Sequence, residues 1–142
     1  MEKIIESFLE KQKNLTFCTA KDNAPYCANC FYAFENENNL LVFKSDSNTQ
    51  HIINALSNEK VARTILPDIG KTGTIKGIQF TGNFIIPEND LKEKAKKKYY
   101  KKFPFASVVP GELWVIELTS IKMTDNTLGF GKKLHWEKTV AV

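Results

Sequence analysis

The sequence predicts an α+β fold that is mainly β, namely a six-stranded antiparallel Greek-key barrel with flanking helices. Six segments have strand character, short polar connections separate most of them, and three helical segments lie at the ends and edges of the strand order. A barrel of this kind closes its own strand edges, and it fits this order of elements better than a doubly wound sheet does. Hydrophobic periodicity alone leaves a β-sandwich open.

The expected strands follow from runs of alternating, β-branched and aromatic residues. They span residues 15–20, 24–35, 40–44, 60–66, 74–86 and 112–124. Asp22 and Asn23 supply the turn between the first two strands. In the fifth strand, Gly77 and Gly82 mark bends or close approaches of the kind that barrels require.

Three helices are expected beside these strands. Residues 2–12 have apolar side chains at helical spacing. Ser47 and Gln50 have the spacing of a capping box, which predicts a helix behind them whose inner face is Ile52, Ile53 and Leu56. Pro87 opens a third, lysine-rich helix, in which acidic residues come early and lysines late, as the helix dipole favours.

Length and charge restrict the function classes. The 142 residues suit a single domain, 1–142. The net charge is +4, but residues 91–103 carry seven lysines against one glutamate, a net +6 that leaves −2 for the remainder. Arg63 is the only arginine, whereas arginine leads in base recognition. We therefore expect a solvated helix face and no nucleic-acid partner.

The sequence also predicts a cytoplasmic protein with no membrane partner and no metal. It lacks the run of about 20 apolar residues that a membrane span needs, and its first residues are too charged for a secretion signal. Cys27 and Cys30 have C-x-x-C spacing, but in a strand this offset places the two thiols on opposite faces. With only two histidines in the chain, we expect structural strand cysteines in a reducing compartment.

Residues 41–56 resemble part of a known family. A strand ends there in the hydroxyl residue Ser45, and a short polar turn leads through Thr49, Gln50 and His51 into a helix. This arrangement resembles the FMN-binding split β-barrels related to pyridoxamine 5′-phosphate oxidase, and the resemblance covers nearly the whole chain. Residues 125–136 look like the tail of an uncharacterised subgroup of small bacterial members. The resemblance implies a six-stranded antiparallel Greek-key split β-barrel, a homodimer, and FMN held where two subunits meet.

The family places the FMN phosphate at the positions matched by Thr49, Gln50 and His51. Physical chemistry supports that placement, because a helix N-terminus presents unpaired N–H groups and the positive end of a dipole. Hydroxyl groups of Ser45, Ser47 and Thr49 add possible hydrogen bonds. The alternative is that Ser47 and Asn48 only cap the helix.

The resemblance further implies contacts with the flavin ring. Asn29, Cys30, Phe31 and Tyr32 would run beside the isoalloxazine, with plain barrel wall as the alternative. Gln79 would reach the polar ring edge, which its amide can bond as donor or acceptor, unless it is a surface residue.

Three further residues complete the set of positions that the resemblance places near the flavin. Lys44 would face the phosphate or the N1–O2 edge, or else lie in solvent. His135 and Trp136 would cover the flavin of the other subunit, or Trp136 would pack on the barrel end. A structural ion pair accounts adequately for Arg63.

The late strand departs from the oxidase pattern. Pyridoxamine phosphate oxidases resemble one another in an arginine-rich phosphate clamp and a late Arg-x-His pair, whereas residues 112–118 contain no arginine. We therefore do not expect vitamin B6 oxidation. The predicted function is a flavin-dependent oxidoreductase with an unidentified small-molecule substrate or electron donor. The alternatives are a non-catalytic flavin binder and a haem-binding split barrel with His51 or His135 as axial ligand.

Overall fold

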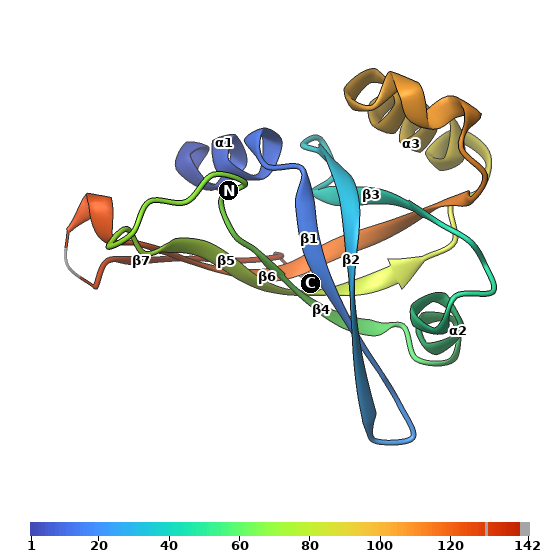
Figure 1. Ribbon diagram of the computed structural model, residues 1–142, viewed down its shortest axis with the longest axis horizontal. Coiled ribbons are helices and arrows are strands. Elements are labelled where there is room, and N and C mark those ends of the chain that lie inside the picture. The colour runs from blue at the N-terminus through green and yellow to red at the C-terminus, as the bar shows by residue number, and fades with distance from the viewer. Residues whose placement is uncertain (130, 140–142) are drawn as a thin grey trace.

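The computed structural model describes residues 1–129 and 131–139, and it contains an antiparallel barrel with helices at its ends (Figure 1). The strands are β1 (Asn14–Lys21), β2 (Ala24–Glu35), β3 (Leu40–Ser45), β4 (Lys60–Ile65), β5 (Lys76–Ile85), β6 (Glu112–Asp125) and β7 (Lys133–Glu137). The sheet order is β3-β2-β1-β4-β5-β6-β7, and β3 also pairs with β6. Six strands therefore close a ring, which confirms the predicted mainly β, α+β barrel.

The count of six strands needs a correction, because β7 is a seventh. β6 pairs with β5 along one edge and is long enough to have two more partners along the other: residues 112–117 pair with β3, and residues 120–124 pair with β7. β7 therefore extends the sheet beyond the closed ring. Its five residues alternate exposed charged or polar side chains with the partly buried Leu134 and Trp136. So short a run, rich in polar residues, gives little strand signal by itself.

The helices are α1 (Lys3–Lys11), α2 (Gln50–Ser57) and α3 (Asn89–Lys102), followed by the short 3₁₀ segments η1 (Pro104–Val108) and η2 (Asn126–Leu128). The expected capping box does not form. The residue before α2 is Thr49, and its hydroxyl donates to the carbonyl of Asp46 at 2.8 Å. Of the three residues expected to face inward, only Ile52 is buried. Pro87 likewise lies two residues before α3 rather than opening it.

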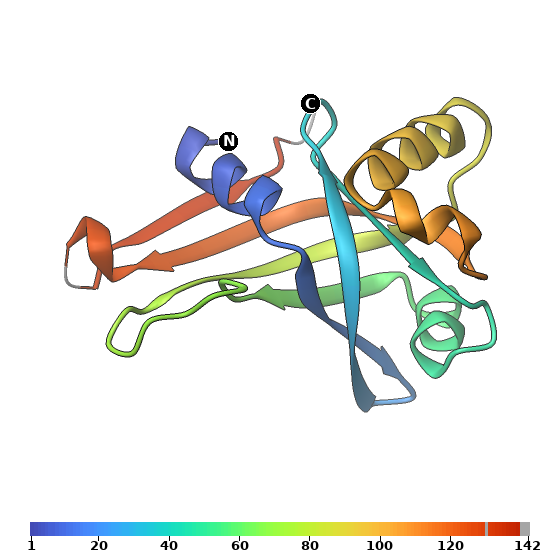
Figure 2. The same ribbon diagram turned by 45° about the horizontal axis from the view of Figure 1, so that its top comes forward.

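Two apolar clusters hold the molecule together. The larger one fills the barrel with aromatic and aliphatic side chains from α1, α2 and all six ring strands. The smaller one joins the outer surface of β3 and β6 to α3, through residues such as Val42, Tyr99 and Val115. Figure 2 shows α3 lying against this part of the barrel, so the outer surface of β3 is covered.

The fifth strand, β5, has one face inside the barrel and one outside. Ile78, Phe80 and Phe84 are buried inside the barrel, whereas Gln79 and Thr81 are exposed outside it. Gly82 lies at a register shift between β5 and β6. A Cβ atom at this position would lie 2.6 Å from the carbonyl oxygen of Glu117, so the predicted close approach is confirmed.

Among the described residues, the helices are all too short or too polar to cross a bilayer. α3 directs Ala95 and Tyr99 toward the barrel and leaves most of its lysines in solvent.

Candidate functional site

Three polar side chains converge where β3 leads into α2. The Oγ of Ser45 lies 2.7 Å from Nε2 of His51 and 3.4 Å from Oγ1 of Thr49, and Thr49 lies 3.3 Å from the same imidazole nitrogen. We call Ser45, Thr49 and His51 the barrel-end cluster. The structure thus brings together three of the residues that the sequence assigned to a phosphate.

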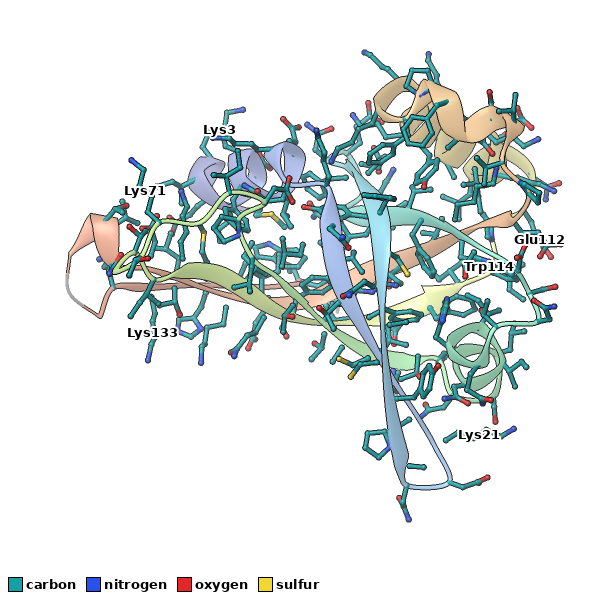
Figure 3. The ribbon with its side chains drawn as sticks, viewed as in Figure 1. Lys3, Lys21, Lys71, Glu112, Trp114 and Lys133 are labelled. Atoms are coloured by element: carbon teal, nitrogen blue, oxygen red, sulfur yellow. The ribbon has the colours of Figure 1, made fainter. Side chains whose placement is uncertain are left out.

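The backbone around the cluster is fixed from β6. The indole Nε1 of Trp114 donates to the carbonyl oxygen of Ser45 at 2.9 Å. Trp114 is itself buried and stacks on Phe84 with ring centroids 5.3 Å apart. Figure 3 shows Trp114 beside α2, at the opposite end of the barrel from Lys133, where β7 begins. A buried aromatic side chain with a satisfied N–H is a rigid support for a binding site.

The imidazole of His51 is neutral at neutral pH. Burial, followed by the positive charge of Arg63, holds the pKa of His51 below its usual value of 6.5. A neutral imidazole has one donor and one acceptor nitrogen. Neutral His51 can therefore donate one hydrogen bond and accept another, and its hydrogen bonds can rearrange around a ligand while the imidazole stays uncharged.

Arg63 lies inside the barrel behind this cluster. It is 1% exposed, and its guanidinium carbon is 3.8 Å from the ring centroid of Phe17 and 4.4 Å from that of Phe43. The ring of Phe17 also contacts His51, at a centroid distance of 5.8 Å. Burial lowers the pKa of Arg63 to about 9, so the side chain is still a cation at pH 7.

The ion pair expected for Arg63 does not form. None of its three side-chain nitrogens has a hydrogen-bond partner among the described residues. A buried polar group without a partner costs free energy, and the cost is larger when the group is charged. The sequence held a signal for this position, because alternation along Val61, Arg63 and Ile65 places all three side chains inside the barrel.

Three other predicted phosphate residues lie elsewhere or are engaged. Ser47 is exposed in the turn before α2. The amide of Gln50 donates to Oδ1 of Asn54 at 2.7 Å. The ammonium of Lys44 donates to the hydroxyl of Tyr100 and to the carbonyl groups of Ala106 and Val109. Lys44 therefore fastens η1 to β3, on the opposite side of that strand from the cluster.

The four consecutive residues predicted on β2 alternate between two environments. Cys30 and Tyr32 face the barrel interior, where the hydroxyl of Tyr32 donates to the carbonyl of Leu9 at 2.7 Å. Asn29 and Phe31 face outward. Asn29 accepts a hydrogen bond from Thr16, and Phe31 packs on Phe103 at a centroid distance of 5.6 Å. At most two of the four side chains can face a ligand on the outer surface.

Gln79 and His135 lie on the outside of the barrel, in an open groove of about 440 Å³. We call it the outer groove; its outward-facing side chains include Thr64, Gln79, Thr81, Ser120, Lys122 and His135. Trp136 also borders it but is half-buried and packs against the barrel core. The groove thus crosses β4, β5, β6 and β7, and these polar groups border a hollow whose lining is mostly apolar.

A single chain therefore does not bring all predicted residues together. The barrel-end cluster lies beside α2, whereas the outer groove lies across the strands toward β7 (Figure 1). β4 contributes to both, with Arg63 directed inward and Thr64 outward.

Proteins of similar sequence define the family. The chain is 38% identical over 135 residues to a UPF0306 protein of Serratia proteamaculans, and the alignment covers 95% of this chain and 94% of the relative. It is 41% identical over 135 residues to a UPF0306 protein of Photorhabdus laumondii, with the same coverage. The chain belongs to the UPF0306 family. No family model matches it.

Solved structures show that the UPF0306 chain shares its fold with cofactor-binding split barrels. A heme binding protein from Mycobacterium smegmatis matches with a TM-score of 0.78 and 13% identity, over 93% of this chain and 56% of that longer one. A pyridoxamine 5′-phosphate oxidase-related, FMN binding protein from Nostoc punctiforme matches with a TM-score of 0.68 and 11% identity, over 96% and 89%. A FAD-binding protein from Mesorhizobium loti matches with a TM-score of 0.68 and 16% identity, over 85% and 92%. At these identities the likeness establishes the fold and no shared activity.

Proposed function

We propose that this UPF0306 chain is an FMN-binding flavoprotein that works as a flavin-dependent oxidoreductase. The observation that supports it best is the barrel-end cluster, in which two hydroxyl groups and an imidazole lie within 3.4 Å of one another. The fold adds support, since proteins named for FMN and FAD binding share it.

The residues of the barrel-end cluster fit a phosphate. A phosphate group offers strong acceptor oxygens and negative charge. Ser45 and Thr49 carry rotatable O–H donors, and His51 carries one donor when neutral and two when protonated. Arg63 contributes a buried cation that has no hydrogen-bond partner among the described residues, and its guanidinium carbon lies 3.8 Å from the centroid of the Phe17 ring, which also contacts His51. The N-terminus of α2 adds the favourable end of a helix dipole.

A second copy of the chain completes the proposed site. The outer groove is open, and Ser45, Thr49 and His51 are not among the described residues that line it. We infer that two chains associate so that the groove of one faces the flavin held by the other. In that arrangement Gln79 offers its amide to the polar edge of the ring, and His135 lies on the same surface.

FMN, when bound, supplies hydride or single-electron transfer. The chain's own residues hold the phosphate, orient the ring and exclude water. Nothing in this assignment requires a protein acid–base pair. The substrate and electron donor are small molecules that the outer groove admits, and a cytoplasmic location remains a prediction.

The test begins with the purified protein. Its visible spectrum and the chromophore released on denaturation separate the candidate cofactors: a flavin gives two near-ultraviolet and blue bands, and haem gives an intense Soret band. The ligand-free protein is then titrated with FMN and with riboflavin, and NAD(P)H consumption is measured on the loaded protein. We expect FMN to bind more tightly than riboflavin. Haem as the released chromophore, or equal affinities for the two flavins, would overturn the FMN assignment, and flavin binding without turnover would overturn the oxidoreductase.

A further inference from the structure

Two cysteines face each other across the β1–β2 hairpin. Cys18 on β1 is the direct register partner of Cys27 on β2, and their sulfur atoms are 3.2 Å apart. A covalent S–S bond is about 2.05 Å long, so the pair is a dithiol in contact. Both cysteines lie in strands, as expected, but Cys27 is exposed and Cys18 half-buried, so their thiols are not confined to the core.

The hairpin geometry suits a bond between them. Asp22 and Asn23 form a two-residue turn with φ values of 51° and 63°, as in a type I′ turn. In such a hairpin Lys21 and Ala24 form a hydrogen-bonded pair, and the alternation then makes Cys18 and Cys27 a non-hydrogen-bonded pair. Opposing Cα atoms at such positions are about 4.5 Å apart, which lies within the range that disulfides span.

Cys30 cannot take the place of either residue. It faces the barrel interior, opposite Leu15, whereas Cys18 and Cys27 face outward. A metal site is equally unsuitable, because no group of three or more metal-ligating side chains occurs in the described part of the chain. The contact therefore has the chemistry of an isolated thiol pair.

The two thiols differ in access. Cys27 is exposed three residues after the start of β2, so a molecule in solution can reach its thiol. Burial and the contact with Cys27 raise the pKa of Cys18 to about 11, so Cys18 remains protonated until its proton is removed during reaction. This difference in access sets the sequence of the two nucleophilic attacks, with Cys27 first and Cys18 second.

We propose that Cys18 and Cys27 form a reversible dithiol/disulfide couple that exchanges with low-molecular-weight disulfides such as oxidised glutathione. The sulfur of Cys27 attacks the small disulfide, forms a mixed disulfide and releases one small thiol. The sulfur of Cys18 then attacks Cys27, which forms the intramolecular bond and releases the second small thiol. The protein dithiol loses two electrons and two protons, and the small disulfide becomes two thiols.

The position of the couple links it to the surface of the barrel. Cys18 borders the outer groove together with Thr64 and Gln79. The oxidised bond would join the two strands beside that groove, without touching the barrel interior. The proposal does not depend on a bound flavin, so it stands or falls separately from the FMN assignment.

The test equilibrates the full chain, without oxygen, in glutathione buffers that range from fully reduced to fully oxidised. Free thiols are then trapped, and intact mass and peptide mapping are recorded. We expect the wild-type protein and a Cys30→Ala variant to lose two hydrogen atoms through a Cys18–Cys27 linkage that a dithiol reductant reverses. A Cys18→Ser variant should stop at a glutathione adduct on Cys27, and a Cys27→Ser variant should form neither product.

Three outcomes would overturn the proposal: a persistent dithiol across the whole buffer range, a linkage that includes Cys30, or a covalent dimer on a non-reducing gel. Circular dichroism and thermal unfolding of each variant establish whether the substitution leaves the fold intact, so that a missing bond in a folded variant reports chemistry.

Discussion

The barrel-end cluster and the outer groove differ in how completely one chain builds them. At the barrel end, Ser45, Thr49 and His51 already contact one another, with the buried cation of Arg63 behind them. In the outer groove, Gln79, Thr81 and His135 are exposed to solvent. Burial makes the difference, because a group removed from water needs partners, whereas an exposed group has water. The first region is ready for an anion, and the second needs a covering surface.

Assembly is the largest effect that this comparison predicts. If a second chain covers the outer groove, the FMN-loaded protein should have twice the mass of the single chain, with an interface as extensive as in obligate homodimers. Light scattering of the loaded protein measures this directly. A monomer with flavin fully bound would mean that the outer groove is not completed by a partner.

Arg63→Met separates stability from binding at the barrel end. The substitution replaces an unpartnered buried cation by an apolar side chain of similar length, so we expect the ligand-free protein to gain about 1–4 kcal/mol in free energy of unfolding. The affinity for FMN should fall at the same time, and that for riboflavin should change less. Denaturant unfolding and ligand titration give the two quantities.

Lys60→Met, at an exposed position of the same strand, is the matched control and should change stability by at most about 0.5 kcal/mol. A clear loss of stability in Arg63→Met would mean that the stacking on Phe17 and Phe43 outweighs the cost of burying the charge.

The double substitution Thr49→Ala with His51→Ala tests the phosphate directly. Losing hydrogen bonds to a charged group should weaken the binding of FMN by about 1.5–3 kcal/mol. The binding of riboflavin, which lacks the phosphate, should be nearly unaffected. Isothermal titration with both ligands checks the difference. Ser47→Ala, in the exposed turn, serves as the control. Equal losses for the two ligands would place the phosphate away from this cluster.

Gln79→Leu tests whether the outer groove contacts the isoalloxazine ring of FMN. A donor at the polar edge stabilises the reduced, anionic flavin more than the oxidised one. Removing it should cost about 1–3 kcal/mol, which lowers a two-electron potential by roughly 20–65 mV. Redox titration with FMN bound measures the shift. An unchanged potential would remove Gln79 from the site, while the barrel-end assignment would survive.

The smallest effect concerns pH. The pKa of His51 is lower in the folded protein than its ordinary value of 6.5, so in the window between the two values the unfolded chain binds more protons. Stability should therefore fall as the pH drops from 6.5 toward the lowered pKa, and level off below it. Thermal unfolding across this window should show the slope in the wild type and a reduced slope in His51→Gln. An identical slope in both proteins would assign it to other groups.

Local pattern determined the positions of most strands. Alternation of apolar and polar residues placed all six ring strands to within one or two residues at their ends. The sequence did not predict β7, because pairing with β6 stabilises this strand and five residues have little periodicity of their own. The capping box failed because the hydroxyl of Thr49 bonds the preceding turn and α2 starts three residues after Ser47.

The contact between Cys18 and Cys27 was also within reach of the sequence. Once the turn is placed at Asp22 and Asn23, counting outward along both strands pairs these two residues. Spacing along a single strand draws attention to Cys27 and Cys30 instead, and those two lie on opposite faces. Register across a hairpin therefore carries more information about cysteine chemistry than spacing within a strand.

The sequence by itself determined the strand positions and the turn at Asp22 and Asn23, because these depend on residues that are close along the chain, and its resemblance to a known family singled out Ser45, Thr49 and His51. Only the tertiary structure decided that Arg63 has no hydrogen-bond partner within residues 1–129 and 131–139, that Lys44 is bonded to η1, and that Gln79 lies apart from the cluster. Each of these three features depends on which side chains come together from elements that are far apart in the sequence. A partner for a buried charge is a property of the closed barrel, and no pattern along one strand encodes it.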